Sequence, residues 1–283
     1  MSLKDVEKTY NDAAPTYDMA FLNAIPDTKR LITIANLKPG NSVLDLGCGT
    51  GKLLIEAKKM VEGGEVCGVD ISPRMLTMAL GNIKKAGLTS QIALIRGNIA
   101  DPEVLTKICP AGGFDIITCL RVLGDMLGSD QLQALQLWKN HLAPSGRIVV
   151  ERKHWQVASL EPIRAIDFQL GPKYALADAQ TWEEAATELR SVATSAGLAV
   201  ISIDRTICQP GDGYVDKVGV IYNYSAKKWQ ENGHKNGDRV DREFIEYQKE
   251  RMTMKWQESL RKEGYQANVK NASVIAVLQI AEC

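Results

Sequence analysis

The stretch Val43-Leu-Asp-Leu-Gly-Cys-Gly-Thr-Gly51 decides the fold of this 283-residue chain. Ser42 to Leu46 is a short apolar run of the length expected for a buried strand. Three glycines follow, and residues 52–61 then repeat apolar side chains at helical spacing. The segment predicts a strand, a glycine-rich turn and a helix. Glycines allow such a turn to adopt positive φ and to approach a ligand closely.

Strand and helix patterns alternate through most of the remaining chain. Further strands are expected over 66–71, 92–96, 114–120, 147–151, 199–207 and 273–282. Helices are expected over 52–61, from the Ser72-Pro73 N-cap to Gly87, over 129–142, and from the Thr181-Trp-Glu-Glu184 capping box to Gly197. The first two should face inward with Leu53, Ala57, Met60 and Val61, and with Met75, Leu76, Ala79, Leu80 and Ile83. This alternation predicts an α/β fold: a doubly wound, mostly parallel seven-stranded sheet with helices on both faces.

The glycine loop matches neither common phosphate-binding pattern. A Walker A loop has four residues between its glycines and Ser or Thr after its lysine, but here three separate the glycines and Leu53 follows the lysine. A dinucleotide loop would need its third glycine at Lys52. Asp45, just before the first glycine, would repel a pyrophosphate and favours a ligand that carries positive charge. Asp70, at the end of the second strand, is placed to accept hydrogen bonds from ribose hydroxyls.

Composition and charge narrow the possible partners. The 34 basic and 34 acidic residues balance, so no global charge favours a nucleic acid or an anionic membrane. The six cysteines are scattered without a C-x-x-C pair, which is typical of small buried side chains. No apolar run reaches the length of a membrane span, and no signal-peptide pattern follows Met1. We expect a soluble, cytoplasmic protein with no metal site and no membrane or nucleic-acid partner.

The combined motifs closely resemble those of the class I, Rossmann-like S-adenosylmethionine (SAM) dependent methyltransferases. Besides the glycine loop, the resemblance rests on Val69-Asp-Ile-Ser72, Gly97-Asn-Ile99 and Leu142-Ala-Pro-Ser-Gly146. It covers roughly residues 40–207 and the last strand. SAM carries a sulfonium and an ammonium but no phosphate, which suits the carboxylate of Asp45. The resemblance implies SAM as the cofactor and S-adenosylhomocysteine (SAH) as the product, and it says little about the acceptor.

The resemblance also implies cofactor contacts at specific positions. These are Asp45 at the methionine amino group, Gly47, Cys48, Gly49 and Gly51 along the methionine portion, Asp70 at the ribose, Ile71, Met75, Asn98 and Ile99 around the adenine, and Leu120 and Arg121 at the methionine end. The family often has Asp where this chain has Asn98, so that contact loses its charge assistance.

The N-terminal segment Tyr10-Asn-Asp-Ala-Ala-Pro-Thr-Tyr17-Asp18 is similar to that of small-molecule methyltransferases of the ubiquinone and menaquinone type. In those enzymes a tyrosine closes over the carboxylate end of the cofactor. The similarity implies that Tyr10 or Tyr17 has this role. Ordinary packing of a terminal helix is the alternative interpretation.

The acceptor site has no sequence signature. A general base would contribute roughly 10²–10⁴-fold if the acceptor were a hydroxyl or thiol. The catalytic candidates are His154, after the fifth strand, and Arg121 and Asp125, after the fourth. For His154, a surface histidine without a role in catalysis is the alternative interpretation. Arg152 is expected to pair either with an acidic acceptor or with Glu151.

Segments 1–38, 153–180 and 208–270 do not fit the strand–helix alternation. The last two follow strands of the sheet, so they should emerge at the carboxyl edge, where open α/β sheets bind ligands. We expect a single methyltransferase domain over residues 1–283 in which these segments form a helical substrate lid; for 208–270, peripheral decoration or an oligomer contact is the alternative.

The expected activity is methyl transfer to a small organic molecule, with O-methylation of a metabolite favoured over N- or S-methylation. Three alternatives remain. These are a protein methyltransferase, an RNA methyltransferase, and a SAM-binding protein that does not methylate, either lyase- or cyclase-like or regulatory.

Overall fold

The computed structural model describes residues 2–21, 28–123, 126, 128–156, 182–207 and 270–281. The chain divides into two compact units, the first made of residues 1–153, 182–208 and 272–283 and the second of 154–181 and 209–271. The second unit lies almost wholly outside the described residues, and so does the substrate lid expected from segments 153–180 and 208–270.

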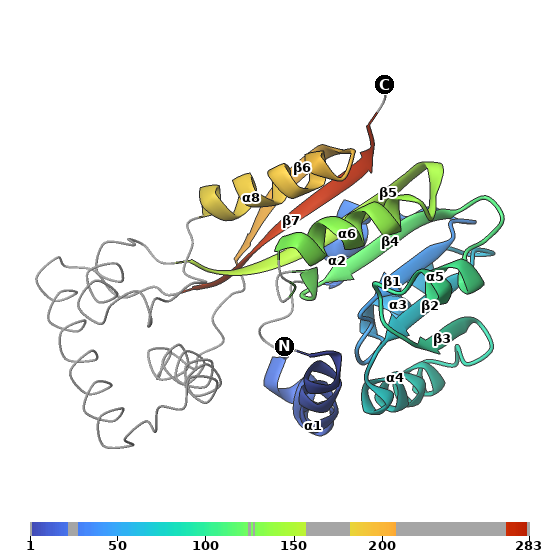
Figure 1. The fold of residues 1–283 in the computed structure, drawn as a ribbon. Helices are drawn as coiled ribbons and strands as arrows, with labels where there is room; N and C mark the ends of the chain where they lie inside the picture. Colours follow the sequence, from blue (N-terminus) through green and yellow to red (C-terminus); the bar gives the residue numbers. More distant parts are fainter. Residues whose placement is uncertain are drawn as a thin grey trace, which may run out of the picture. The chain divides into compact units, whose positions relative to one another are not determined.

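A seven-stranded sheet forms the centre of the first unit (Figure 1). Its strands are β1 (Val43–Leu46), β2 (Val66–Asp70), β3 (Ile92–Arg96), β4 (Phe114–Leu120), β5 (Leu142–Gln156), β6 (Leu198–Ile207) and β7 (Lys270–Ile280). They are ordered β3-β2-β1-β4-β5-β7-β6. The pairs from β3 to β5 are parallel, whereas β7 pairs with β6 in antiparallel fashion. The strand order reverses at β1 and β4, which is where open α/β sheets bind ligands.

Helices cover both faces of the sheet (Figure 1). They are α1 (Leu3–Phe21), α2 (Thr28–Ala35), α3 (Lys52–Met60), α4 (Pro73–Lys85), α5 (Pro102–Ile108), α6 (Gly128–Lys139) and α8 (Trp182–Ser195). Buried side chains of α2, α3 and α4 pack with one face of the strands, and those of α5, α6 and α8 pack with the other. The expected α/β fold, with its doubly wound, mostly parallel seven-stranded sheet, is confirmed. Within the described ranges, no helix is long and apolar enough to cross a membrane.

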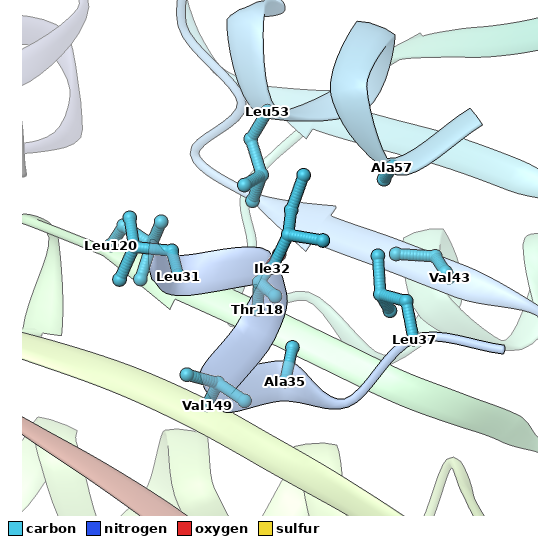
Figure 2. Close-up of a pocket in the computed structure, with 10 residues that line it drawn as sticks. All are labelled: Leu31, Ile32, Ala35, Leu37, Val43, Leu53, Ala57, Thr118, Leu120 and Val149. Carbon is cyan, nitrogen blue, oxygen red and sulfur yellow. The ribbon is translucent and has the colours of Figure 1, made fainter. Parts of the chain in front are cut away.

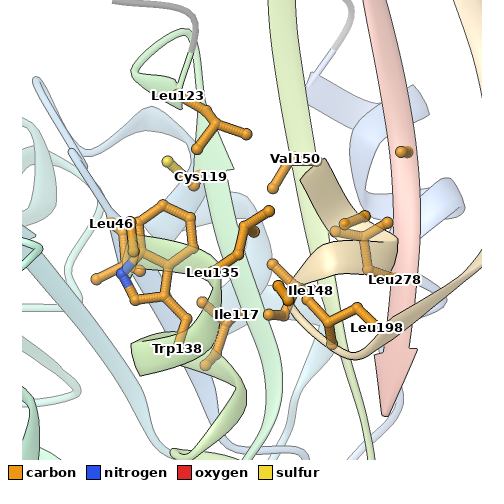
Figure 3. Close-up of a cluster of buried hydrophobic side chains, with 14 of the residues drawn as sticks. Leu46, Ile117, Cys119, Leu123, Leu135, Trp138, Ile148, Val150, Leu198 and Leu278 are labelled. Carbon is orange, nitrogen blue, oxygen red and sulfur yellow. The ribbon is translucent and has the colours of Figure 1, made fainter. Parts of the chain in front are cut away.

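The larger core centres on Trp138 of α6 (Figure 3). This indole is fully buried among strand residues, including Leu46 and Ile117, and its Nε1 donates a hydrogen bond of 2.9 Å to the carbonyl of Ile99. Because the donor of a buried tryptophan needs a partner, this bond ties α6 to the turn after β3. The turn carries Asn98 and Ile99, two of the residues expected near the adenine.

One helix and one strand extension differ from the expectation. The described part of segment 1–38, which was expected to be helical, includes α1 and α2, whereas α5 was not expected. Asp101 caps α5 by accepting a hydrogen bond from Glu103 N, with a proline at the first helical position, and this local signal was readable in the sequence. Strand β5 begins at Leu142, not at 147, because a register shift opposite Phe114 and Ile116 takes up the Pro144–Gly146 stretch within the strand.

Two expected inward positions are wrong. Met60 is 48% exposed and Leu80 is 50% exposed. Both lie at the margin of the apolar stripe of their helix, and Leu54, which was not selected, is fully buried instead. Helical periodicity therefore located each helix correctly and misplaced its inward face by about one residue at the edge.

Candidate functional site

The glycine loop follows β1 at the carboxyl edge of the sheet. Gly47 has φ +77°, and the amides of Gly47 and Cys48 both donate to the carbonyl of Val69, at 2.8 and 3.0 Å. A Cβ on Gly47 would lie 2.4 Å from Cγ2 of Val122, in the turn after β4. Positive φ and this close approach both require glycine here. The side chain of Cys48 is buried in the core beside Gly68, so Cys48 contributes only its backbone to the surface of the loop.

Asp70 links the loop to the end of β2. One carboxylate oxygen accepts from Gly49 N at 2.9 Å, and the other accepts from Ser72 N at 2.8 Å. Burial raises the pKa of Asp70, while the hydrogen bonds from backbone amides of Ser72, Gly49 and Ile71 oppose the rise. A carboxylate oxygen has two lone pairs. The three amides occupy three of the four lone pairs of the Asp70 carboxylate, which therefore keeps at least one acceptor position for a ligand hydroxyl.

Asp45 is buried on β1 beside β4. Its Oδ1 accepts a 2.7 Å hydrogen bond from the hydroxyl of Thr118. The pKa of Asp45 is raised to about 7, mainly by burial and also by the nearby charge of Asp70, although the hydrogen bond from Thr118 opposes the rise. A cationic ligand at this edge would favour the ionised form of Asp45. Thr118 was not singled out from the sequence, because its partner lies 73 residues away.

The residues expected around the adenine are spread between the edge and the core. Ile71 is half-buried, whereas Met75 is fully buried and its amide donates to Ser72 Oγ. Asn98 is half-buried, and its Oδ1 accepts from Ala100 N at 3.0 Å. Ile99 is buried. Ile71 and Asn98 thus leave some surface at the carboxyl edge.

Arg121 follows β4 with φ +62°, a conformation that is uncommon and strained for a residue other than glycine. Its Nε lies 3.6 Å from Oε2 of Glu151, whose side chain is fully buried on β5. Leu120 and Glu151 are register partners, so this charge pair joins the end of β4 to the adjacent part of β5, which continues to Gln156. Glu151 was expected as one of two alternative partners of Arg152, and this alternative is wrong because Glu151 pairs with Arg121.

Arg152 pairs with Glu188 of α8. The physical reason is the alternation of side chains in a strand: consecutive residues such as Glu151 and Arg152 point to opposite faces of the sheet. Of the other catalytic candidates, Asp125 lies outside the described residues, and so does the side chain of His154. Arg121 is therefore the one catalytic candidate whose side chain the structure places.

Helix α1 brings further residues to this edge. The rings of Tyr10 and Tyr17 are neighbours, with centroids 6.5 Å apart. Asn11 accepts a hydrogen bond from Ser72 Oγ at 2.7 Å, and Asp18 accepts one from Thr50 Oγ1 at 2.8 Å. Asn11 and Asp18 were missed as site residues, although their seven-residue spacing places them on one face of a helix.

The charge arrangement at the loop suits a cationic ligand. Lys52 is turned toward Asp18, with 3.1 Å between Nζ and Oδ1. The carboxyl groups of Asp45 and Asp70 lie near the loop, and the charge of its lysine is compensated by an ion pair. This arrangement disfavours a phosphate and fits SAM. Within the described ranges, no group of three or more His, Cys, Asp or Glu side chains is placed to hold a metal ion.

A small apolar cavity lies between α2, α3 and the sheet (Figure 2). It has a volume of about 10 Å³ and is lined by Leu31, Ile32, Ala35, Leu37, Val43, Leu53, Ala57, Thr118, Leu120 and Val149. This volume is at the lower limit for one water molecule. The cavity is a packing gap in the core, not a ligand site.

The strand order, with β7 antiparallel beside β6, and the glycine loop after β1 together define the class I, Rossmann-like SAM-dependent methyltransferases. A family model described as a methyltransferase domain matches residues 37–206. The chain belongs to this family, an enzyme family that uses SAM as its methyl donor.

Solved structures of SAM-dependent methyltransferases share the fold. One from Thiobacillus denitrificans, in complex with SAH, has a TM-score of 0.53 and 17% identity over 90% of this chain and 92% of that one. Another from Geobacter sulfurreducens, also with SAH, has a TM-score of 0.50 and 18% identity over 89% of this chain and 90% of that one.

Curated relatives match a shorter part of the chain. A nocamycin O-methyltransferase of Saccharothrix syringae is 32% identical over 44% of this chain and 41% of the relative. A demethylmenaquinone methyltransferase of Thermus thermophilus is 30% identical over 50% and 62%, and a protein-lysine N-methyltransferase of Saccharolobus islandicus is 33% identical over 27% and 47%. The chain thus spans about half the length of these relatives, whose acceptors range from small molecules to proteins.

Proposed function

We propose that this protein binds SAM at the carboxyl edge of β1, β2 and β4 and transfers its methyl group to a small organic molecule, with a hydroxyl as the favoured acceptor. The observation that carries the proposal is the pair of buried carboxyl groups, Asp45 and Asp70, on the two sides of the glycine loop. The charge of the lysine in this loop is compensated by an ion pair. This arrangement favours a ligand with a ribose and positive charge and disfavours phosphates.

In the proposed complex, the loop from Gly47 to Gly51, including Cys48 and Gly49, borders the methionine portion through its backbone. Asp45 receives the amino group, directly or through water, and Asp70 accepts hydrogen bonds from the ribose. The remaining contacts come from Ile71, Met75, Asn98 and Ile99 around the adenine, from Leu120 and Arg121 at the methionine end, and from Tyr10 or Tyr17 at the carboxylate.

Bound SAM supplies a methyl group that its sulfonium already activates for displacement. The protein mainly has to hold the acceptor in line with that methyl group, and such alignment can contribute about 7–11 kcal/mol of the barrier. The pair of Arg121 and the buried Glu151 lies where the end of β4 meets β5, beside the proposed methionine end. Its role is to orient the acceptor. Asp125 and His154 remain proposed proton acceptors.

The charge balance and two relatives support a small acceptor. The chain is neutral overall, which gives no attraction to the phosphates of RNA. Two relatives act on small molecules by name, the nocamycin and demethylmenaquinone methyltransferases. We further propose that residues 1–283 form one domain in which segments 1–38, 153–180 and 208–270 enclose this acceptor.

An acceptor screen with methyl-labelled SAM tests the proposal. We expect label to transfer to small phenolic or enolic hydroxyl compounds and SAH to form in equal amount. Three panels should be run in parallel: hydroxyl, amine and thiol compounds; a protein lysate; and total RNA. Label in the protein or RNA fraction, or tight SAM binding with no transfer to any panel, would contradict the proposed function.

A further inference from the structure

One face of α1 is directed at the sheet. Glu7, Asn11, Ala14 and Asp18 recur at intervals of four, three and four residues, so they lie on one stripe of the helix. Ala14 is the buried residue of this stripe, with 1% of its surface exposed, and its small side chain allows close approach. The other three residues of this stripe are polar, and each of them forms a hydrogen bond with a residue outside α1.

These partners lie at the ends of three adjacent strands. They are Arg96, the last residue of β3, with Nη2 2.9 Å from Glu7 Oε1; Ser72, just after β2, with Oγ 2.7 Å from Asn11 Oδ1; and Thr50, in the loop after β1, with Oγ1 2.8 Å from Asp18 Oδ1. The three strands are neighbours in the order β3-β2-β1. Helix α1 therefore crosses the carboxyl edge along this side of the sheet, beside α4 (Figure 1).

The contact of Asp18 is the one that meets the glycine loop. Its carboxylate accepts the hydrogen bond of the buried Thr50 hydroxyl and pairs with Lys52 Nζ at 3.1 Å. On its other side, Thr50 accepts a 3.0 Å hydrogen bond from Asn82 of α4 through its carbonyl. The residue between Gly49 and Gly51 is thus held by α1 and by α4 at once.

We propose that Asp18 is a positioning residue that couples the docking of α1 to cofactor binding. This inference rests on the proposed function, because it concerns the same SAM site. Asp18 fixes the loop at Thr50 and compensates the charge of Lys52 through the ion pair, so the docked helix holds the loop in the form that accepts a cationic ligand. By thermodynamic reciprocity, a ligand that binds this form strengthens the docking of α1.

The test compares two aspartates of the same helix. Asp18→Ala removes the hydrogen bond and the ion pair at the loop, whereas Asp12→Ala removes an exposed pair with Lys8 within α1 itself. Both substitutions favour helix formation equally. Titration calorimetry with SAH should show affinity reduced on the order of tenfold in Asp18→Ala, the effect of one charge-assisted hydrogen bond. Asp12→Ala should bind as the wild type does.

Two further readouts separate positioning from a general loss of structure. Asp18→Asn keeps an oxygen that can accept from Thr50, so it should restore part of the affinity. Hydrogen exchange should show that SAH protects the amides of residues 3–21 in the wild type and fails to protect them in Asp18→Ala, while both proteins keep the same protection in β4 and β5.

Each outcome decides between the two proposals. If the wild type binds SAH and Asp18→Ala binds it equally well, or if Asp12→Ala loses as much affinity, the coupling through Asp18 is wrong and the proposed function stands. Absence of SAH protection over residues 3–21 in a wild type that binds SAH also overturns the coupling. A wild type that binds no SAH overturns both.

Discussion

At the scale of single residues, the candidate site depends on a few closely packed contacts. Gly47 is in contact with Val122, so the turn after β4 rests directly on the glycine loop. Arg121, the neighbour of Val122, is in the left-handed region and paired with the buried Glu151. The proposed methionine end and the proposed acceptor end of the site therefore share one tightly packed contact, in which small changes of volume have large effects.

Gly47→Ala tests this contact against a matched glycine. Gly87 has nearly the same φ, +74° against +77°, but its Cβ would meet nothing within 4 Å. Gly87→Ala should cost only the strain of positive φ, roughly 1–2 kcal/mol of unfolding free energy. Gly47→Ala adds a 2.4 Å clash with Val122 and should cost roughly 1–3 kcal/mol more, with loss of SAH binding. Urea unfolding and calorimetry measure both; equal losses in the two variants would contradict the close contact.

Asp45 predicts a pH dependence of stability in the absence of ligand. Its pKa is raised from 3.8 to about 7 by burial, so between these values the folded state holds a proton that the unfolded state has released. The contribution of Asp45 is therefore fully present below about pH 4 and is lost as pH rises to about 7. Its size is on the order of a few kcal/mol.

The check on Asp45 is a comparison with Asp45→Asn, which cannot titrate. Urea unfolding of the two proteins from pH 5 to pH 8 should show a steeper decline in the free energy of unfolding for the wild type. Parallel pH profiles would show that the carboxyl of Asp45 is not protonated in the folded protein.

At the scale of elements, helix termini organise the carboxyl edge. Ser72 caps α4 by accepting from Met75 N, and the same hydroxyl donates to Asn11 of α1. Asp101 caps α5 and bonds only locally, to Glu103 N. The two caps are alike in sequence, each followed by proline, but only Ser72 also joins two helices.

Ser72→Ala and Asp101→Ala should therefore differ. Each loses an N-cap, at about 1 kcal/mol of stability. Ser72→Ala should in addition speed hydrogen exchange across residues 3–21, because α1 loses one of its contacts with the sheet edge. Hydrogen exchange measured by mass spectrometry in both variants tests this difference. Unchanged exchange of α1 in Ser72→Ala would show that the hydrogen bond between Ser72 and Asn11 does not stabilise the contact of α1 with the sheet edge.

At the scale of the whole molecule, the fold gathers the ends of separate strands into one site. Asp45, Asp70 and Glu151 come from β1, β2 and β5, which the parallel arrangement aligns at a common edge. A ligand that contacts several of these ends should stabilise the entire first unit, since it binds only the folded state.

SAH should raise the melting temperature of the full chain. At a concentration 100 times the Kd, the gain is about 2.7 kcal/mol, which corresponds to roughly 5–10 °C for a domain of 150–250 residues. Asp70→Ala should abolish most of the shift, because the ribose acceptors are removed together with the bond to Gly49 N. Differential scanning calorimetry with and without SAH measures this, and a full shift in Asp70→Ala would show that Asp70 does not hold the ribose.

The sequence by itself determined the elements whose signals are local. The glycine loop, the Ser72-Pro73 cap and the apolar strand runs each occupy a few consecutive residues, and the observed strands agree with them to within a few residues except at β5. The α/β class and the cofactor class follow from these local signals, since spacing around the loop already separates SAM from a nucleotide phosphate.

Only the tertiary structure decided which side chains meet. Thr118 with Asp45, Asn11 with Ser72, and Arg121 with Glu151 are pairs between distant parts of the chain. No local periodicity encodes such pairs, because they depend on the register of strands and on the docking of α1. The glycine loop and the carboxylates of Asp45 and Asp70 could be identified in the sequence, whereas their partners, and the contacts of α1 and of the turn after β4 with the loop, depend on the strand ends being brought to one edge.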